Sequence, residues 1–215
     1  MKNLKIPYIS CELLIKEADI LLFHAPKQWW KLGYWISKFT ASPYSHVALA
    51  HWDNNRLYCV EFREFIGSRC ELLKLRIDEG FQIDVYRVDT EVNMPYIEQV
   101  KTFDGKVAFR YNVRVMAFTQ DKANCITMEA KKLIGRKYGW SVIWSIIKTF
   151  IPGLRVFVDK EKETKVEAYV CSTLIAKTYH RCYADLVPFI SDALTTPSDI
   201  ARSAYLNYLF TIKGE

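Results

Sequence analysis

Three residues of this sequence have side chains suited to joint chemistry, namely a histidine, a glutamate and a distant cysteine. His46 lies in the apolar stretch PYSHVALA, Glu61 lies in LYCVEF, and Cys171 begins CSTLIAKTYH. An imidazole can take the proton of a thiol, and a carboxylate can fix the tautomer of that imidazole. Together the three residue types indicate nucleophilic catalysis by cysteine. The alternative is that each has a structural role only.

A predicted β-hairpin brings the histidine and the glutamate together. The Asn-Asn pair at 54–55 suits a two-residue turn that needs positive φ. This turn would pair Leu49 with Val60 on an apolar face that belongs to the core. His46 and Glu61 then share the opposite face, diagonal to each other and within reach for long side chains. The alternative is an ordinary polar pair on the surface of a sheet.

Cys171 is the cysteine in the position best suited to activation. It follows the short apolar stretch AYV and opens a helical pattern. A helix N-terminus and a nearby imidazolium lower a cysteine pKa to roughly 3.5–7.5. The backbone N–H of Cys171 could also help to hold an oxyanion. The alternative is a buried core thiol. No comparable position is held by the other five cysteines, Cys11, Cys59, Cys70, Cys125 and Cys182.

The other three histidines are expected to be structural or to lie on the surface. In the predicted register His51 points to the apolar face, and His24 follows a strand just before Ala25-Pro26. His180 lies on the same predicted helix as Cys171, too far along it to turn back.

The composition of the chain is that of a packed globular protein. It has 215 residues, of which 50% are hydrophobic and 14% aromatic, so we expect a single domain over 1–215. The net charge of +6 and the sequence pI of 8.9 favour approach to anionic surfaces. No nucleic-acid partner is expected, because no stacking or helix-turn-helix signature accompanies the charge.

The cysteine and histidine spacings predict neither a metal site nor a cofactor. The sequence has no C-x-x-C pair and no Cys/His cluster with zinc spacing. The chain does not resemble a disulfide scaffold, so we expect free thiols in a reducing compartment.

No segment has the pattern of a signal peptide or of a transmembrane helix, which needs about 20 apolar residues. The longest apolar stretch, 138–153, is broken by Lys148 and ends at Pro152-Gly153. It is predicted to be a buried helix, or alternatively a helix that lines a lipid pocket. We therefore expect a cytoplasmic or peripherally membrane-associated protein.

Strands and helices are predicted without regular βαβ alternation, which indicates an α+β fold. The amphipathic segment 27–39 places Trp30 and Tyr34 beside lysines, a pattern that suits either a membrane interface or packing on a sheet. Strands are predicted in 17–23, 45–52, 56–62 and 81–88, helices in 27–39, 123–134 and 171–180, and an exposed loop in 155–170.

Six segments, in this order, resemble one family. They are ADILLF with the following SPYSHVALA, then LYCVEF, QIDVYRV, LIGRKYGW, YVCSTLIAKTY and TTPSDIARS, and they cover about residues 18 to 203. The chain is similar to the circularly permuted papain-like amidases of the NlpC peptidase superfamily, the YiiX/YaeF-like branch, in which the histidine precedes the cysteine. It departs from the family pattern at Ala18, Gly139 and Thr173.

The resemblance implies a permuted papain-like fold with an antiparallel sheet packed against helices. It implies Cys171 as nucleophile, His46 as base and Glu61 as orienting group. It further implies substrate contacts at Tyr44, Tyr138 and Ser172, and a hydrophobic pocket beside the site.

The expected function is hydrolysis of an amide or related acyl bond by a Cys-His-Glu triad. The substrate would be a cell-wall peptide or a lipid-linked acyl compound. The alternatives are an acyltransferase, or a catalytically weak module that binds a lipid membrane or a cell envelope through the Trp-rich stretch 27–39.

Overall fold

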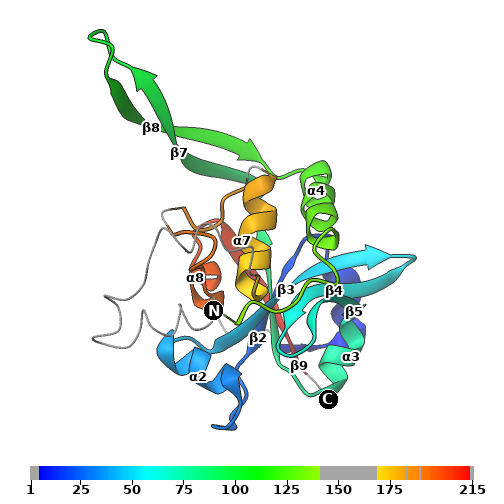
Figure 1. The fold of residues 1–215 in the computed structure, drawn as a ribbon. Helices are drawn as coiled ribbons and strands as arrows, with labels where there is room; N and C mark the ends of the chain where they lie inside the picture. Colours follow the sequence, from blue (N-terminus) through cyan, green and yellow to red (C-terminus); the bar gives the residue numbers. More distant parts are fainter. Residues whose placement is uncertain (1–4, 141–168, 183, 189, 214–215) are drawn as a thin grey trace.

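The computed structural model describes residues 5–140, 169–182, 184–188 and 190–213. Its centre is a seven-stranded sheet in the order β1-β9-β6-β2-β3-β4-β5 (Figure 1). All neighbouring strands are antiparallel except β1 and β9. The strands are β1 (Lys5–Pro7), β2 (Ile20–His24), β3 (Tyr44–Asp53), β4 (Arg56–Arg63), β5 (Gly67–Leu72), β6 (Ile83–Val88) and β9 (Leu206–Lys213).

Helices cover the sheet, and a separate two-stranded hairpin projects from the body of the molecule (Figure 1). The described helices are α1 (Tyr8–Cys11), the 3₁₀ turn η1 (Glu12–Leu14), α2 (Leu32–Phe39), α3 (Leu73–Asp78), α4 (Gln120–Lys131), α7 (Cys171–Arg181) and α8 (Pro197–Ala201), and the hairpin is β7 (Glu91–Lys101) with β8 (Val107–Ala117). The predicted α+β class, with an antiparallel sheet packed against helices, is confirmed.

The predicted hairpin register is also confirmed. Leu49 pairs with Val60 across β3 and β4, and the ladder continues to Asp53 and Arg56 at the turn. The turn residues Asn54 and Asn55 have φ of 47° and 59°, the left-handed conformation that asparagine tolerates.

The sheet is buried on both faces, whereas the sequence predicted one apolar core face for the hairpin. Val47 and Leu49 belong to a core that includes residues of α4 and α7. Ala48 and Ala50 belong to a second core with Phe23. The prediction was wrong because α3 and the segment around α1 supply the apolar cover of the second face, in a list that includes Leu73, Ile77, Cys11 and Ile15.

Several element boundaries differ from the sequence prediction. The predicted helix 27–39 begins only at Leu32, and residues 27–31 form turns instead. The predicted helix 123–134 is α4, which starts earlier because the Thr119 side chain caps it by accepting the N–H of Lys122. Strands β1, β5, β7, β8 and β9 were not predicted. The apolar stretch 138–153 and the loop 155–170 lie mostly outside the described residues.

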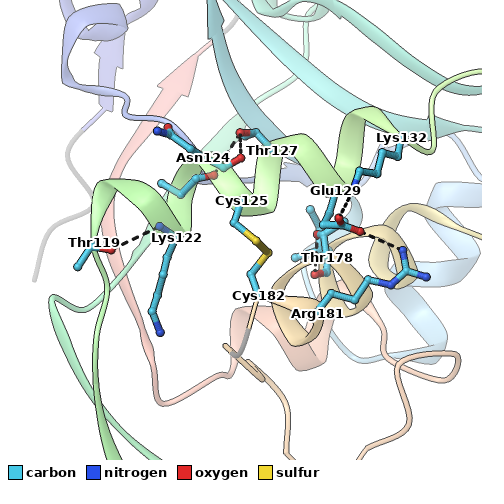
Figure 2. Close-up of a disulfide and its surroundings, with 12 residues drawn as sticks. Thr119, Lys122, Asn124, Cys125, Thr127, Glu129, Lys132, Thr178, Arg181 and Cys182 are labelled. Carbon is cyan, nitrogen blue, oxygen red and sulfur yellow. Dashed lines mark hydrogen bonds and ion pairs between the residues drawn. A yellow bond between two sulfur atoms is a disulfide. The ribbon is translucent and has the colours of Figure 1, made fainter.

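The expectation of six free thiols was wrong. Cys125 of α4 and Cys182, at the C-terminus of α7, form a disulfide (Figure 2). The other four cysteines are free. The spacing of 57 residues gave no signal, because only the packing of α4 against α7 brings the two sulfurs together.

None of the helices in the described part of the chain is long and apolar enough to cross a membrane.

Candidate functional site

The predicted histidine and glutamate are joined by a hydrogen bond where β3 and β4 separate. His46 Nε2 lies 2.7 Å from Glu61 Oε2. The ladder between the two strands runs from the hairpin turn to Leu49 and Val60. Both polar residues therefore lie beyond the paired part of the strands, and their side chains connect the strands in place of the backbone.

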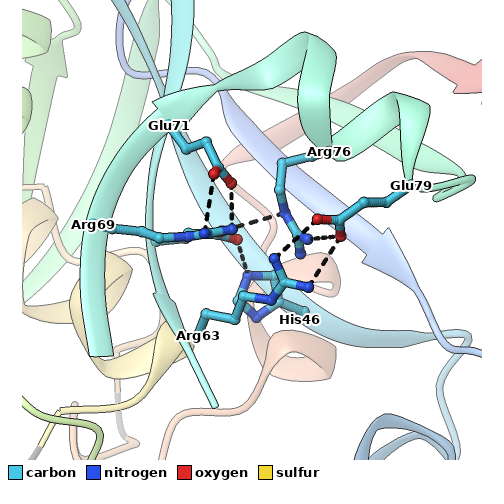
Figure 3. Close-up of polar contacts among 7 residues, drawn as sticks. His46, Arg63, Arg69, Glu71, Arg76 and Glu79 are labelled. Atoms are coloured by element: carbon cyan, nitrogen blue, oxygen red, sulfur yellow. Dashed lines mark hydrogen bonds and ion pairs between the residues drawn. The ribbon is translucent and has the colours of Figure 1, made fainter. Parts of the chain in front are cut away.

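Glu61 is completely buried and is held by two arginines as well as by the imidazole. Arg69 Nε donates to Glu61 Oε1 at 3.0 Å, and Arg76 Nε lies 3.2 Å from the same oxygen. Figure 3 shows the histidine and both arginines converging from β3, β5 and α3. Burial favours the neutral acid, but the hydrogen bond and charge of His46 with the charges of Arg76 and Arg69 lower the Glu61 pKa to about 2. The carboxylate is therefore ionised across the physiological range.

Arg76 is itself buried, and its guanidinium is held in position by contacts with two aromatic rings and a second carboxylate. Its guanidinium lies over the rings of Phe23 and Phe81, at 5.2 and 4.7 Å from their centroids. It also forms an ion pair with Glu79. The carboxylate that orients His46 is thus fixed by a cation that is fixed in turn by aromatic packing.

Cys171 is the first residue of α7, which packs on β3 and β4 (Figure 1). The N-cap residue is Val170, which has no side-chain oxygen and makes no capping bond. Because no cap occupies the amides of the first turn, these amides and the helix dipole are available to stabilise a thiolate or an oxyanion.

The charge of the Cys171 sulfur affects the imidazole of His46. Burial alone lowers the pKa of His46, but the charge of the Cys171 sulfur, a hydrogen bond to it and the Glu61 carboxylate raise the pKa to about 9. Since Nε2 is bonded to Glu61, Nδ1 is the ring nitrogen that remains for the thiol. The arrangement can transfer a proton from sulfur to the ring and keep the resulting imidazolium stable.

A carboxylate neighbour does not by itself distinguish His46 from the other histidines. His24 is bonded to Asp84, and His180 to Asp192. His51 Nδ1 donates to Glu17 at 2.7 Å, and its other nitrogen lies 3.2 Å from Lys131 Nζ, so it links β3 to α4. What sets His46 apart is that the charge of a free cysteine, Cys171, raises its pKa.

The three residues predicted to contact substrate lie in different surroundings. The Tyr44 hydroxyl donates to Asp84 at 2.7 Å and lies 3.0 Å from the Tyr86 hydroxyl, so it is engaged in a buried polar cluster. Ser172 is buried, next to Cys171 in α7. The charge of the Cys171 sulfur affects Tyr138, because burial and then the charges of Cys171 and Glu64 raise the Tyr138 pKa.

The sequence prediction missed the two arginines that hold the glutamate. Arg69 lies directly opposite Glu61 in the ladder between β4 and β5. A β-turn predicted at residues 64–66 would have fixed the register of β4 and β5 and so placed Arg69 opposite Glu61. Arg76 lies on a short helix whose position no pattern in the sequence indicated.

No protein-family model matches this chain, and no curated protein has a significantly similar sequence. The fold is similar to the crystal structure of the metalloprotein yiiX (DUF1105) from Escherichia coli O157:H7. The TM-score is 0.55 at 13% sequence identity, over 90% of this chain and 96% of that chain. The chain therefore has a YiiX-like α+β fold.

The name of that protein raises the question of a metal, and the described residues do not fit one. Within residues 5–140, 169–182, 184–188 and 190–213, no group of three His, Cys, Asp or Glu side chains is placed to hold an ion. In the candidate site the Glu61 oxygens already accept from His46 and face Arg69 and Arg76. Two guanidinium charges beside the carboxylate oppose the binding of a cation.

Proposed function

We propose that this protein is a cysteine hydrolase with a permuted papain-like arrangement that acts on an amide or related acyl bond. The observation that carries the proposal is the hydrogen bond of His46 to a buried, ionised Glu61, and the charge of the Cys171 sulfur, which raises the His46 pKa, supports it. The order of histidine before cysteine in the chain supports the permuted arrangement. A cell-wall peptide or a lipid-linked acyl compound is the proposed substrate.

In the proposed reaction His46 Nδ1 takes the proton of Cys171, and the thiolate attacks the carbonyl carbon. The carbonyl oxygen becomes an oxyanion next to the amides of the first turn of α7. When the bond to the leaving group breaks, the imidazolium gives its proton to that group and a thioester remains. His46 then removes a proton from water, which attacks the thioester and releases a carboxylic acid and the thiol.

Glu61 orients the ring and stabilises the imidazolium in this proposal. It accepts from Nε2 and remains ionised throughout, as its lowered pKa requires. Arg69 and Arg76 hold Glu61 and contact no reacting atom, so they are positioning residues.

A thiol-reactive acyl probe tests the proposal. The probe should label Cys171, and the His46→Ala variant should lose this labelling. Cys70 offers a matched control because it is a free thiol and more exposed than Cys171, but burial raises its pKa. The Cys70→Ala variant should therefore label like the wild type. Undiminished labelling of Cys171 in His46→Ala would contradict the proposed pair.

The substrate class requires a screen of cell-wall fragments against acyl lipids. Each hit is repeated with the Cys171→Ala variant, which should have no activity. Turnover by that variant would overturn the mechanism.

An acyltransferase is the second candidate function. Only 4% of Cys171 is exposed, so an acyl group on the sulfur would be shielded from bulk water. This favours transfer to an acceptor other than water. The rate at which the acylated protein loses its acyl group, measured with and without added amines or alcohols, separates a transferase from a hydrolase.

A further inference from the structure

Three tryptophans in the segment before β3 point their rings into solvent. The exposed fractions are 66% for Trp29, 69% for Trp30 and 44% for Trp35. Single exposed apolar residues are common on soluble proteins, but a cluster of large aromatic rings marks a contact surface. Trp29 and Trp30 lie edge to face, with ring centroids 6.1 Å apart, so they form one patch.

Helix α2, which follows Trp29 and Trp30 and carries Trp35, packs closely on the sheet. Gly33, the second residue of α2, is buried so closely against β3 that a β-carbon there would lie 2.9 Å from Ser45 Oγ. On the outer side Trp35 packs against Tyr34 and Phe39, at 5.5 and 5.9 Å. The helix therefore buries Gly33 on the sheet and presents Trp35 outward.

The exposed charges of the segment that carries the tryptophans are all positive. Lys27, Lys31 and Lys38 are all exposed, and no Asp or Glu occurs in the sequence from 20 to 52. After α8, the Arg202 side chain donates to the Ala41 carbonyl and adds a further positive charge beyond the end of α2.

We propose that this tryptophan–lysine surface (Lys27, Trp29, Trp30, Lys31, Trp35 and Lys38) docks the protein onto an anionic lipid surface. Indole rings favour the interface between lipid and water, where an apolar ring and a polar N–H are both satisfied. Lysines beside them attract anionic headgroups. A second copy of the chain fits less well, because self-association would bring the same lysines against one another.

Helix α2, which carries Trp35, contacts the strand that holds His46. The residue that Gly33 contacts, Ser45, directly precedes His46 in β3. The inference concerns binding and does not depend on turnover by Cys171. For that reason the Cys171→Ala variant should bind lipid like the wild type, and a failure of the hydrolase proposal would leave the docking proposal intact.

Vesicle co-sedimentation with the full chain tests the proposal. The wild type should bind vesicles of phosphatidylglycerol mixed with phosphatidylcholine, and binding should weaken as salt is added. Replacing Lys27, Lys31 and Lys38 by Gln should weaken binding by on the order of 100-fold, at about fivefold per lysine. The double variant Trp29→Ala, Trp30→Ala should lose about tenfold per ring. Thermal unfolding checks that each variant is folded.

The exposed tip of the β7–β8 hairpin supplies the matched control. Phe103 and Lys101 are also an exposed aromatic ring and an exposed lysine. The Lys101→Gln, Phe103→Ala variant should bind vesicles like the wild type. The proposal is overturned if this variant loses binding while the Trp29, Trp30 variant retains it.

Two further results would also overturn the proposal. One is equal binding to pure phosphatidylcholine without salt dependence. The other is a dimer in sedimentation that the tryptophan substitutions dissociate, together with no binding to vesicles. In the bound state, the fluorescence of Trp29 and Trp30 should be protected from a water-soluble quencher. Protection already present without vesicles would mean that another part of the protein covers the patch, and it would count against the proposal.

Discussion

The imidazole of His46 and the carboxylate of Glu61 lie 2.7 Å apart at the point where β3 and β4 stop pairing. The contact therefore has two consequences. It fixes the orientation of the ring, and it joins two strands that have no backbone ladder there. Substitutions at either residue should affect folding as well as activity.

The pKa of His46 should depend on Cys171. Burial lowers this pKa, but the interaction with Cys171 is the largest of the effects that raise it to about 9. The Cys171→Ala variant should therefore titrate its His46 at lower pH, as measured by NMR of the ring protons. The Cys70→Ala variant should leave the titration unchanged. An unaltered His46 pKa in Cys171→Ala would show that the two groups do not interact.

Stability should fall as pH rises through the alkaline range. The folded pKa of His46 is about 9, above the ordinary value of 6.5, so the folded state binds this proton more tightly than the unfolded state. The resulting stabilisation is complete below about 6.5 and is lost by about 9. It amounts to at most about 3 kcal/mol. Urea unfolding at a series of pH values should show this slope in the wild type and a weaker one in His46→Gln.

Replacing Glu61 by Gln should destabilise the folded protein and also lower the rate of the proposed reaction. In the structure the substitution leaves the buried Arg76 with only the more exposed Glu79 as a carboxylate partner, which costs up to about 3–5 kcal/mol. Denaturant unfolding measures the effect. Glu71→Gln removes a more exposed partner of Arg69 and should cost less than about 1 kcal/mol. Equal losses for the two variants would contradict this account.

The disulfide should contribute substantially to stability. Closing a loop between residues 57 apart restricts the unfolded chain by about 4 kcal/mol. The double variant Cys125→Ser, Cys182→Ser should lose stability of this order in urea unfolding. In the wild type, a thiol assay in denaturant without reductant should count four free thiols. A count of six would exclude the bond under the conditions of the assay.

The close approach of α2 to β3 should make Gly33 intolerant of a larger side chain. Alanine has a higher helix propensity than glycine, so this substitution normally stabilises a helix. Here, however, the β-carbon of alanine would lie 2.9 Å from Ser45 Oγ and 3.0 Å from Pro26 Cδ. Gly33→Ala should therefore cost about 1–3 kcal/mol. A Ser45→Gly substitution should recover part of this loss, and a thermal-unfolding double-mutant cycle measures the coupling. A stabilising effect of Gly33→Ala would refute the close packing.

The sequence predicted the part of the site that depends on local pattern. The Asn54-Asn55 turn specifies the β3–β4 register, and this register places His46 near Glu61 because side chains alternate along a strand. Cys171 could be chosen because the start of a helix is visible as a change of periodicity.

The rest depends on contacts that no local pattern encodes. Arg76 reaches Glu61 from a helix of six residues, too short to show a clear period. The burial of Ala48 and Ala50 results from residues of α3 and of the N-terminal segment, which are remote in sequence. The Cys125–Cys182 bond likewise requires the docking of two helices. The prediction was therefore most accurate for one hairpin and least accurate where distant elements meet.

Helix α7 carries sulfur at both ends, and the two ends need opposite treatment in the laboratory. The proposed chemistry needs Cys171 as a thiol, whereas Cys182, eleven residues later, is cross-linked to α4. A strong reductant that keeps Cys171 reduced can also reduce the Cys125–Cys182 disulfide and so release the C-terminal end of α7 from α4. Purification without any reductant leaves Cys171 open to oxidation. Mild reducing buffers, checked by a thiol count on each batch, are therefore the right starting point for any assay of this protein.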